Sequence, residues 1–115
     1  MSAPVIDTAV FGELQATAGS EFVAELVDTF FEEAPLMLAE LRAARAASHA
    51  ERFKRAAHSL KSNSQTFGAT TLGKMARELE LAGLDADVQR DAEALDALDS
   101  AYAQAAAELG CLSHG

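Results

Sequence analysis

Residues 55–68 read RAAHSLKSNSQTFG, and this segment decides how the rest of the chain is interpreted. At about 100° per residue, the apolar and small side chains of this region fall within roughly 80° of arc, which is typical of the buried face of a helix. These side chains are Phe53, Ala57, Leu60, Ser64 and Phe67. His58 lies well away from that face. The segment therefore predicts a helix that packs on one side and displays one histidine on the other.

The surroundings of His58 on this helix are polar and cationic. Its neighbours within one or two turns include Lys54, Lys61, Ser62 and Gln65. A neutral imidazole is nucleophilic near pH 7, and ammonium charge attracts an incoming phosphoryl group. Lys61 is expected to screen the phosphoryl oxygens, while Gln65 and Ser62 are expected to donate hydrogen bonds to them or to the ring. No carboxylate lies three or four residues from His58, so the histidine is expected to act without an orienting partner.

A longer pattern begins at the same histidine. Residues 58–69 read HSLKSNSQTFGA, and they are followed by Leu72 and by ARELE at residues 76–80. This arrangement resembles the signature of histidine-containing phosphotransfer (HPt) domains, whose pattern is roughly His-x-Leu-Lys, then small residues, then a Gly-Ala pair.

The resemblance can be carried over one residue at a time. His58 matches the phosphorylated histidine, and Lys61 matches the lysine beside it. Ser62 matches the small position that lets a partner approach, and Gly68 matches the glycine after the helix. Asn63 departs from the pattern, because a smaller residue is more usual there.

The resemblance implies an all-α fold: an antiparallel up-down four-helix bundle with a short N-terminal helix lying across it. The chain is expected to form one HPt domain over residues 1–115, with 1–6 and 110–115 as loose tails. The resemblance also implies a phosphorelay intermediate that accepts a phosphoryl group on His58 from a receiver-domain aspartyl phosphate. The group then passes to the aspartate of a response regulator.

The partners implied by the resemblance are receiver domains and a hybrid histidine kinase. The receiver is expected to supply Mg²⁺ and most of the catalytic apparatus, so the chain is expected to need no cofactor of its own. It carries no Gly-rich phosphate loop, which agrees with a phosphotransfer protein that lacks an ATP site. A monomer is expected.

Charge and composition narrow the possible partners. The 115 residues are enough for one domain, and the net charge of −9 argues against nucleic acid. Four of the nine basic residues nevertheless fall in the histidine helix, namely Arg52, Lys54, Arg55 and Lys61. Such a basic island suits a partner whose own site is acidic, so Lys54 and Arg55 join Ser62 and Gly68 as expected partner contacts.

Other residue types exclude further classes of function. Cys111 is the single cysteine, so a reducing, cytoplasmic compartment is expected. The sequence has no stretch long and apolar enough to span a bilayer, so no membrane association is expected. His49, His58 and His114 are scattered, and no histidine or carboxylate lies four residues from His58 to form a metal-ligand pair with it, so no metal is expected.

Capping signals divide the chain into helices. Asp7 is expected to cap a first helix that ends near residue 17, and Ser20 to cap the second. Pro35 falls inside the apolar pattern of the second helix, which predicts either a kink or a break into two helices. Ser48 and Glu51 have the spacing of a capping box, which is expected to start the third helix.

The second half of the chain shows similar signals. Gly68 is expected to end the third helix in a left-handed conformation, and Thr70 or Thr71 to cap the fourth. Gly83 is expected to close the fourth helix. A heptad-like apolar pattern then predicts a fifth helix over residues 88–109.

Two other functions remain open at this point. The chain could be an adaptor that binds receivers without phosphotransfer. It could also be the dimerisation and phosphoacceptor fragment of a histidine kinase, which would form its four-helix bundle as a dimer.

Overall fold

A computed structural model describes residues 5–84 and 87–114. Every regular element in these two ranges is a helix, so the all-α class is confirmed. The five helices are α1 (Thr8–Ala18), α2 (Ser20–Ala46), α3 (Ala50–Thr66), α4 (Thr70–Ala82) and α5 (Val88–His114).

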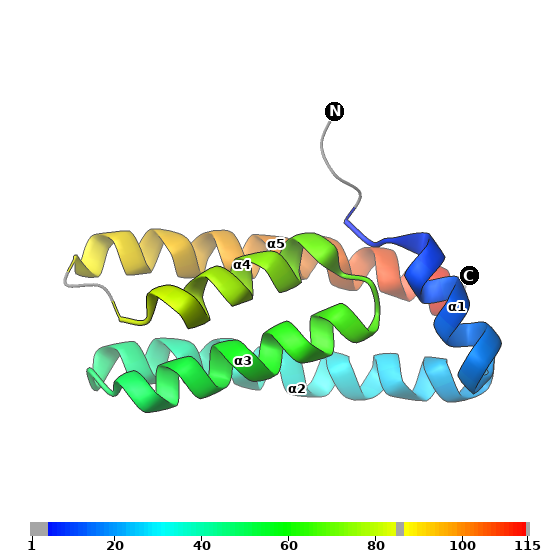
Figure 1. Ribbon diagram of the computed structural model, residues 1–115, viewed down its shortest axis with the longest axis horizontal. Coiled ribbons are helices and arrows are strands. Elements are labelled where there is room, and N and C mark those ends of the chain that lie inside the picture. The colour runs from blue at the N-terminus through cyan, green and yellow to red at the C-terminus, as the bar shows by residue number, and fades with distance from the viewer. Residues whose placement is uncertain (1–4, 85–86, 115) are drawn as a thin grey trace.

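The four helices α2 to α5 run side by side and alternate in direction (Figure 1). The short helix α1 lies across the end of the molecule at which α3 ends and α4 begins. Helix α3 packs against α2 and α4, and α5 packs against the same two helices. Among the described residues α3 makes no contact with α5, so these two helices lie diagonally opposite each other.

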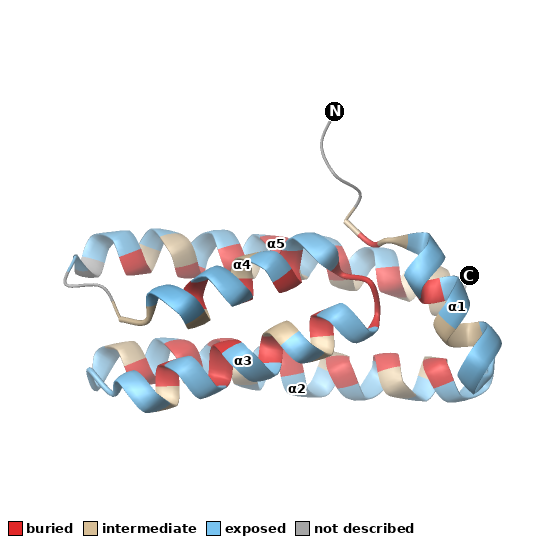
Figure 2. Ribbon diagram, in the orientation of Figure 1, coloured by how far each residue is buried: buried red, intermediate tan, exposed pale blue. Residues whose placement is uncertain are grey.

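The core lies between these helices, and buried residues recur along each of α2 to α5 (Figure 2). Helix α3 buries the face that the sequence predicts, with Phe53, Ala57 and Leu60 fully buried. Ser64 is the polar member of this face, and its hydroxyl donates a hydrogen bond to the Leu60 carbonyl at 2.6 Å. The opposite face of α3 is thereby fixed toward solvent.

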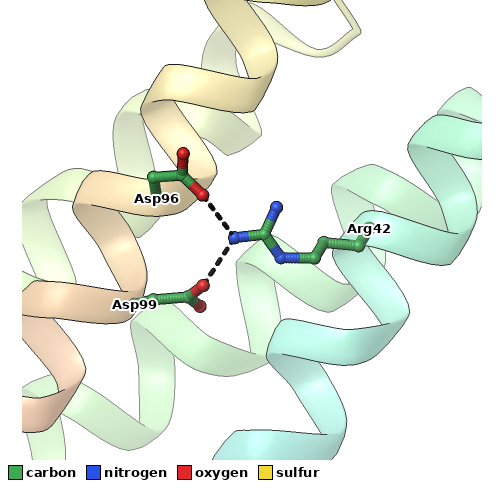
Figure 3. A network of polar contacts seen from close by, with 3 residues as sticks. All are labelled: Arg42, Asp96 and Asp99. Atoms are coloured by element: carbon green, nitrogen blue, oxygen red, sulfur yellow. Dashed lines mark hydrogen bonds and ion pairs between the residues drawn. The ribbon is translucent and has the colours of Figure 1, made fainter.

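Ion pairs set the position of α2 against its neighbours. The guanidinium of Arg42 contacts both Asp96 and Asp99 of α5, with N···O distances of 2.9 and 2.5 Å (Figure 3). Arg45 pairs with the buried Asp91 of α5 at 3.1 Å. Exposed ion pairs add little stability, but a fixed geometry favours one register of the helices over others.

Pro35 lies inside α2 without ending it. The helix runs unbroken from Ser20 to Ala46, so the alternative of two helices is wrong. Buried side chains occur on both sides of the proline, including Phe30, Ala34 and Leu38. The burial of a continuous apolar stripe therefore outweighs the hydrogen bond that proline cannot donate.

Two of the expected N-caps are wrong. Gly19 precedes α2 as its cap, and Ser20 is already the first helical residue. Ala69 occupies the same position before α4, and Thr70 begins the helix. Gly19 has a φ of 94°, a conformation that favours glycine over a residue with a capping side chain, and the Thr70 hydroxyl donates to the Gly68 carbonyl instead of capping α4.

The connection between α2 and α3 also differs from the expected capping box. Ser48 adopts a left-handed conformation with φ of 53°. The amides of Ser48 and His49 donate to the carbonyls of Arg45 and Ala44, which is a Schellman motif ending α2. The cap of α3 is His49, whose Nδ1 accepts a hydrogen bond from the amide of Arg52 at 3.2 Å.

The conformation of Ser48 leads to a prediction about stability. A left-handed conformation costs a non-glycine residue about 1–2 kcal/mol, and glycine avoids this cost while losing about 0.5–1 kcal/mol of backbone entropy on folding. We expect Ser48→Gly to raise the free energy of unfolding by about 0.5–1 kcal/mol. Chemical denaturation measures this change, and Ser48→Ala, which keeps the strain, should show no such gain.

Both tails are shorter than expected. Ile6 is 2% exposed and Val5 packs against the core, so the N-terminal tail cannot include residues 5 and 6; residues 1–4 lie outside the described part of the chain. Helix α5 continues past Gly110 to residue 114, so residues 110–114 are not a loose tail either. Leu109 is buried and Leu112 packs against the core, and their burial offsets the low helix propensity of Gly110.

Gly68 ends α3 in the left-handed conformation that the sequence predicts, with φ of 77°. The amides of Gly68 and Ala69 donate to the carbonyls of Gln65 and Ser64, which completes a second Schellman motif. The Gly68 carbonyl accepts a hydrogen bond from the amide of Asp7 at 2.7 Å. Gly68 therefore joins the end of α3 to the segment that leads into α1.

Candidate functional site

His58 lies near the middle of α3, on the face opposite the core. Its side chain is 57% exposed, while Ala57 and Leu60 on the buried face have no exposed surface. The ring is therefore accessible to a large partner as well as to water. The helix that carries it is held in place by packing against both α2 and α4.

A carboxylate from the neighbouring helix contacts this ring. Glu80 of α4 places Oε2 at 2.7 Å from the Nδ1 atom of His58. Its other oxygen, Oε1, lies 2.9 Å from the Nζ atom of Lys61. Glu80 thus bridges the imidazole and the ammonium group, and the three side chains form one compact cluster, which we call the His58 cluster.

The cluster assigns the proton on the imidazole. An ionised carboxylate can only accept hydrogen bonds, so the Nδ1 atom facing Glu80 must carry the hydrogen. In the neutral ring the other nitrogen, Nε2, then holds the free electron pair. Of the two ring nitrogens, Nε2 is therefore the one whose electron pair could act as a nucleophile.

The charge of Glu80 is favoured by the same contacts. The hydrogen bond from Lys61, followed by that from His58, holds the pKa of the Glu80 carboxyl below its usual range. Glu80 is therefore ionised at neutral pH and remains a hydrogen-bond acceptor for both partners.

The expectation that His58 has no orienting partner is wrong. That expectation depends only on the residues one turn away from His58 on the same helix, where no carboxylate occurs. The partner comes from α4, 22 residues along the chain. The sequence signal for it is Glu80 at the end of the 76–80 run, on a helix expected to pack antiparallel to α3.

Small residues bring α3 and α4 close enough for these contacts. Gly73 is buried in the first turns of α4, and a Cβ atom there would lie 3.3 Å from the Gln65 side chain and 3.6 Å from that of Ser64. Ala57 and Ala76 are also buried at 0% exposure. Because the two backbones approach closely, the side chain of Glu80 is long enough to reach from α4 to α3.

Three of the other predicted site residues lie around the histidine on α3. Lys54 and Arg55 line a shallow hollow of about 290 Å³ together with His58 and Glu80. Arg55 also forms an exposed ion pair with Glu51 at 3.7 Å. Ser62 is exposed one turn beyond the histidine.

Gln65 and Gly68 lie further from the ring. Both line a second hollow, of about 320 Å³, which they share with Lys74 and Arg77 of α4. His58 is not among the residues of that hollow. Gly68 itself is buried, and a Cβ atom at this position would lie 2.7 Å from the Asp7 carbonyl oxygen. Its conformation is therefore required by the fold.

An apolar hollow beside the site was missed by the sequence analysis. Leu36 of α2 is 69% exposed and, with Met37, lines a hollow of about 300 Å³ between α2 and α3. Arg55 and Ser59 border both this hollow and the one at His58. Leu36 directly follows Pro35 and falls outside the periodic apolar pattern of α2. The exposure of a single leucine cannot be recognised before the orientation of its helix is known.

Two further properties concern the described residues. Within 5–84 and 87–114, no three His, Cys, Asp or Glu side chains come together as ligands for a metal ion. No helix in that part of the chain combines the length and the apolar character needed to cross a membrane.

Comparisons with known proteins agree with this geometry. The family model for the Hpt domain matches residues 25–108, which include α3, α4 and the His58 cluster. The fold is similar to the crystal structure of histidine-containing phosphotransfer protein B (HptB) from Pseudomonas aeruginosa PAO1, with a TM-score of 0.87 and 28% sequence identity. That similarity covers 98% of this chain and 97% of the other. A comparison with curated proteins finds no match. The chain belongs to the Hpt domain family.

Proposed function

We propose that this protein is a phosphorelay intermediate whose His58 accepts a phosphoryl group from the aspartyl phosphate of a receiver domain. The group then passes to the aspartate of a response regulator. The observation that carries this proposal is the contact between Nδ1 of His58 and Glu80, because it leaves Nε2 as an exposed nucleophile. Membership of the Hpt family supports the same role.

The transfer balances without any further reactant. The electron pair on Nε2 attacks phosphorus, a P–N bond forms, and the P–O bond to the partner aspartate breaks to release its carboxylate. The ring then carries a positive charge with the hydrogen still on Nδ1, and the adjacent Glu80 carboxylate stabilises this cation. In the onward step an aspartate oxygen of the regulator attacks phosphorus and the neutral imidazole returns.

Lys61 has a different part in this scheme. Its ammonium group lies 2.9 Å from Glu80 in the resting protein. As phosphoryl oxygens arrive beside the ring, Lys61 can turn from the carboxylate toward them and offset their charge. Mg²⁺ bound by the receiver would offset more of that charge, and this chain would need no cofactor of its own.

The surroundings of His58 suit a receiver domain as partner. Lys54 and Arg55 provide positive charge beside the ring, where the acidic reaction centre of a receiver would approach. The apolar hollow at Leu36 and Met37 offers a surface to bury at the edge of the same site. A hybrid histidine kinase would supply the donor receiver, and a monomer is sufficient for each of these contacts.

The function is tested by mixing the purified protein with receiver domains of its host that carry labelled aspartyl phosphate. We expect label to move to this chain as an acid-labile, base-stable phosphohistidine. Binding of a receiver with no transfer of label would favour the adaptor instead. A dimeric mass in sedimentation would favour the histidine-kinase fragment.

Substitution of Glu80 tests how the histidine is oriented. We expect Glu80→Ala to lower the transfer rate at saturating receiver by about tenfold, because the ring loses both its fixed tautomer and its counter-charge. Glu80→Gln can still accept a hydrogen bond from Nδ1, so it should recover part of the lost rate. Rapid-quench measurement of single turnovers gives these rates, and equal rates in all three proteins would exclude a role for Glu80.

The lowered pKa of Glu80 predicts how stability depends on pH. A carboxyl whose pKa is lower in the folded state stabilises the protein above the unfolded pKa, and this contribution is lost as the pH falls through the folded pKa. We expect the stability advantage of wild type over Glu80→Gln to shrink as the pH falls below about pH 4. Urea denaturation between about pH 5 and pH 3 measures it. An advantage that did not shrink over this range would contradict the assignment.

A further inference from the structure

Two cations of α4 form no ion pair with any carboxylate that the structure describes. The chain has nine lysine and arginine residues. Arg90 is engaged in contacts, and five others form ion pairs with carboxylates: Arg42, Arg45, Arg52, Arg55 and Lys61. Among the side chains that the structure describes, no carboxylate pairs with the remaining three, Lys54, Lys74 and Arg77. All three lie on α3 or α4, the helices that carry the His58 cluster.

Lys74, Arg77 and Glu80 follow one another along the surface of α4. Arg77 precedes Glu80 by three residues and Lys74 precedes Arg77 by three, a spacing that makes each side chain a neighbour of the next. Both cations line the hollow that Gln65 of α3 borders. Arg77 and Lys74 therefore place positive charge about 4.5 and 9 Å along α4 from Glu80, at a rise of 1.5 Å per residue. We call this surface, formed by Lys74, Arg77 and Gln65, the α4 strip.

The local environment adds to the positive potential of the α4 strip. The first turn of α4 contains no acidic residue, and its cap residue Ala69 has no side chain that could accept a hydrogen bond. Lys74 is the fifth residue of α4 and lies about one turn from the positive end of the helix dipole. Glu78 is the nearest acid along the helix. It lines a different hollow, which it shares with Gln104 of α5 and with Lys74. No ion pair joins Glu78 to Lys74 within the described residues.

We propose that the α4 strip is a docking surface for the acidic face of the receiver domain that exchanges its phosphoryl group with His58. This inference rests on the proposed function. A receiver reacts through an aspartate, so negative charge surrounds its reaction centre and would be repelled by a protein of net charge −9. A positive strip that begins at Arg77, one turn before Glu80, and runs away from the histidine attracts the partner and fixes its angle of approach, without touching the reacting atoms.

The test compares Lys74→Gln/Arg77→Gln with wild type in transfer from one labelled receiver. Charged groups at the rim of an interface act mainly on association, so we expect kcat/KM to fall by about three- to tenfold at low salt. The rate at saturating receiver should not change. At about 0.5 M salt the difference should shrink below about twofold, because screening removes long-range attraction.

A matched control makes the same change in net charge elsewhere. Ser100→Glu/Ala107→Glu adds two negative charges at exposed positions of α5, which has no contact with α3. This variant should keep kcat/KM within about twofold of wild type. An unchanged kcat/KM in the Lys74/Arg77 variant would overturn the proposal, and so would an equal loss in the control or a lower saturating rate. If wild type itself received no label, the proposed function would fail instead.

Discussion

Replacing His58 by glutamine is expected to reduce phosphoryl acceptance to background, a loss of at least about 10³-fold. Glutamine is polar and tolerated in helices, but its amide has no nucleophilic electron pair. The side chain of His58 is 57% exposed and belongs to no part of the core, so the fold should persist. The measurement is transfer of label from a phosphorylated receiver, with circular dichroism to verify the helices.

His49 provides the matched control for this experiment. It is also an exposed histidine, but it caps α3 through its Nδ1 atom, and no carboxylate contact to its ring occurs among the described residues. His49→Asn keeps a side chain that can cap the helix. We expect this variant to accept label at the wild-type rate. Loss of label in His49→Asn with retention in His58→Gln would show that His49, and not His58, is the phosphorylated residue.

The second large effect concerns stability. We expect Gly68→Ala to lower the free energy of unfolding by about 2–4 kcal/mol. The residue has a φ of 77°, and the new Cβ atom would lie 2.7 Å from the Asp7 carbonyl oxygen. Relieving this contact would also strain the hydrogen bond from the Asp7 amide to the Gly68 carbonyl. Denaturation by urea, with the transfer rate of the folded fraction measured in parallel, separates this effect from a loss of docking.

Gly12 allows a direct comparison with Gly68. It lies inside α1, and a Cβ atom there would meet nothing within 4 Å. Gly12→Ala should therefore raise stability by up to about 1 kcal/mol through helix propensity. The two substitutions are expected to change the free energy of unfolding in opposite directions, because the two glycines have different backbone conformations. A neutral result for Gly68→Ala, with weaker receiver binding, would favour a partner contact as its main role.

The helices and the position of His58 could be predicted because they depend on local patterns. The buried face of α3 follows from the spacing of Phe53, Leu60 and Ser64. The end of α3 follows from Gly68, because few other residues adopt a left-handed conformation at low cost. These signals lie within a few residues of the feature that they determine.

The features that sequence analysis missed depend on contacts between distant segments. Glu80 reaches His58 only because α4 packs closely against α3, and no spacing along one helix indicates such a contact. The sequence predicts Ser48 as the cap of α3, but Ser48 is part of the Schellman motif that ends α2, and His49 caps α3. Helix α5 extends past Gly110 because packing of Leu112 against the core outweighs local propensity.

The most direct test of this account is the site of phosphorylation within the imidazole ring. NMR spectra of the phosphorylated protein, with ¹⁵N in the histidine rings, identify which nitrogen of His58 is bonded to phosphorus. The contact between Glu80 and Nδ1 predicts phosphorus on Nε2 and a hydrogen on Nδ1. Phosphorus on Nδ1, or on a residue other than His58, would contradict the account.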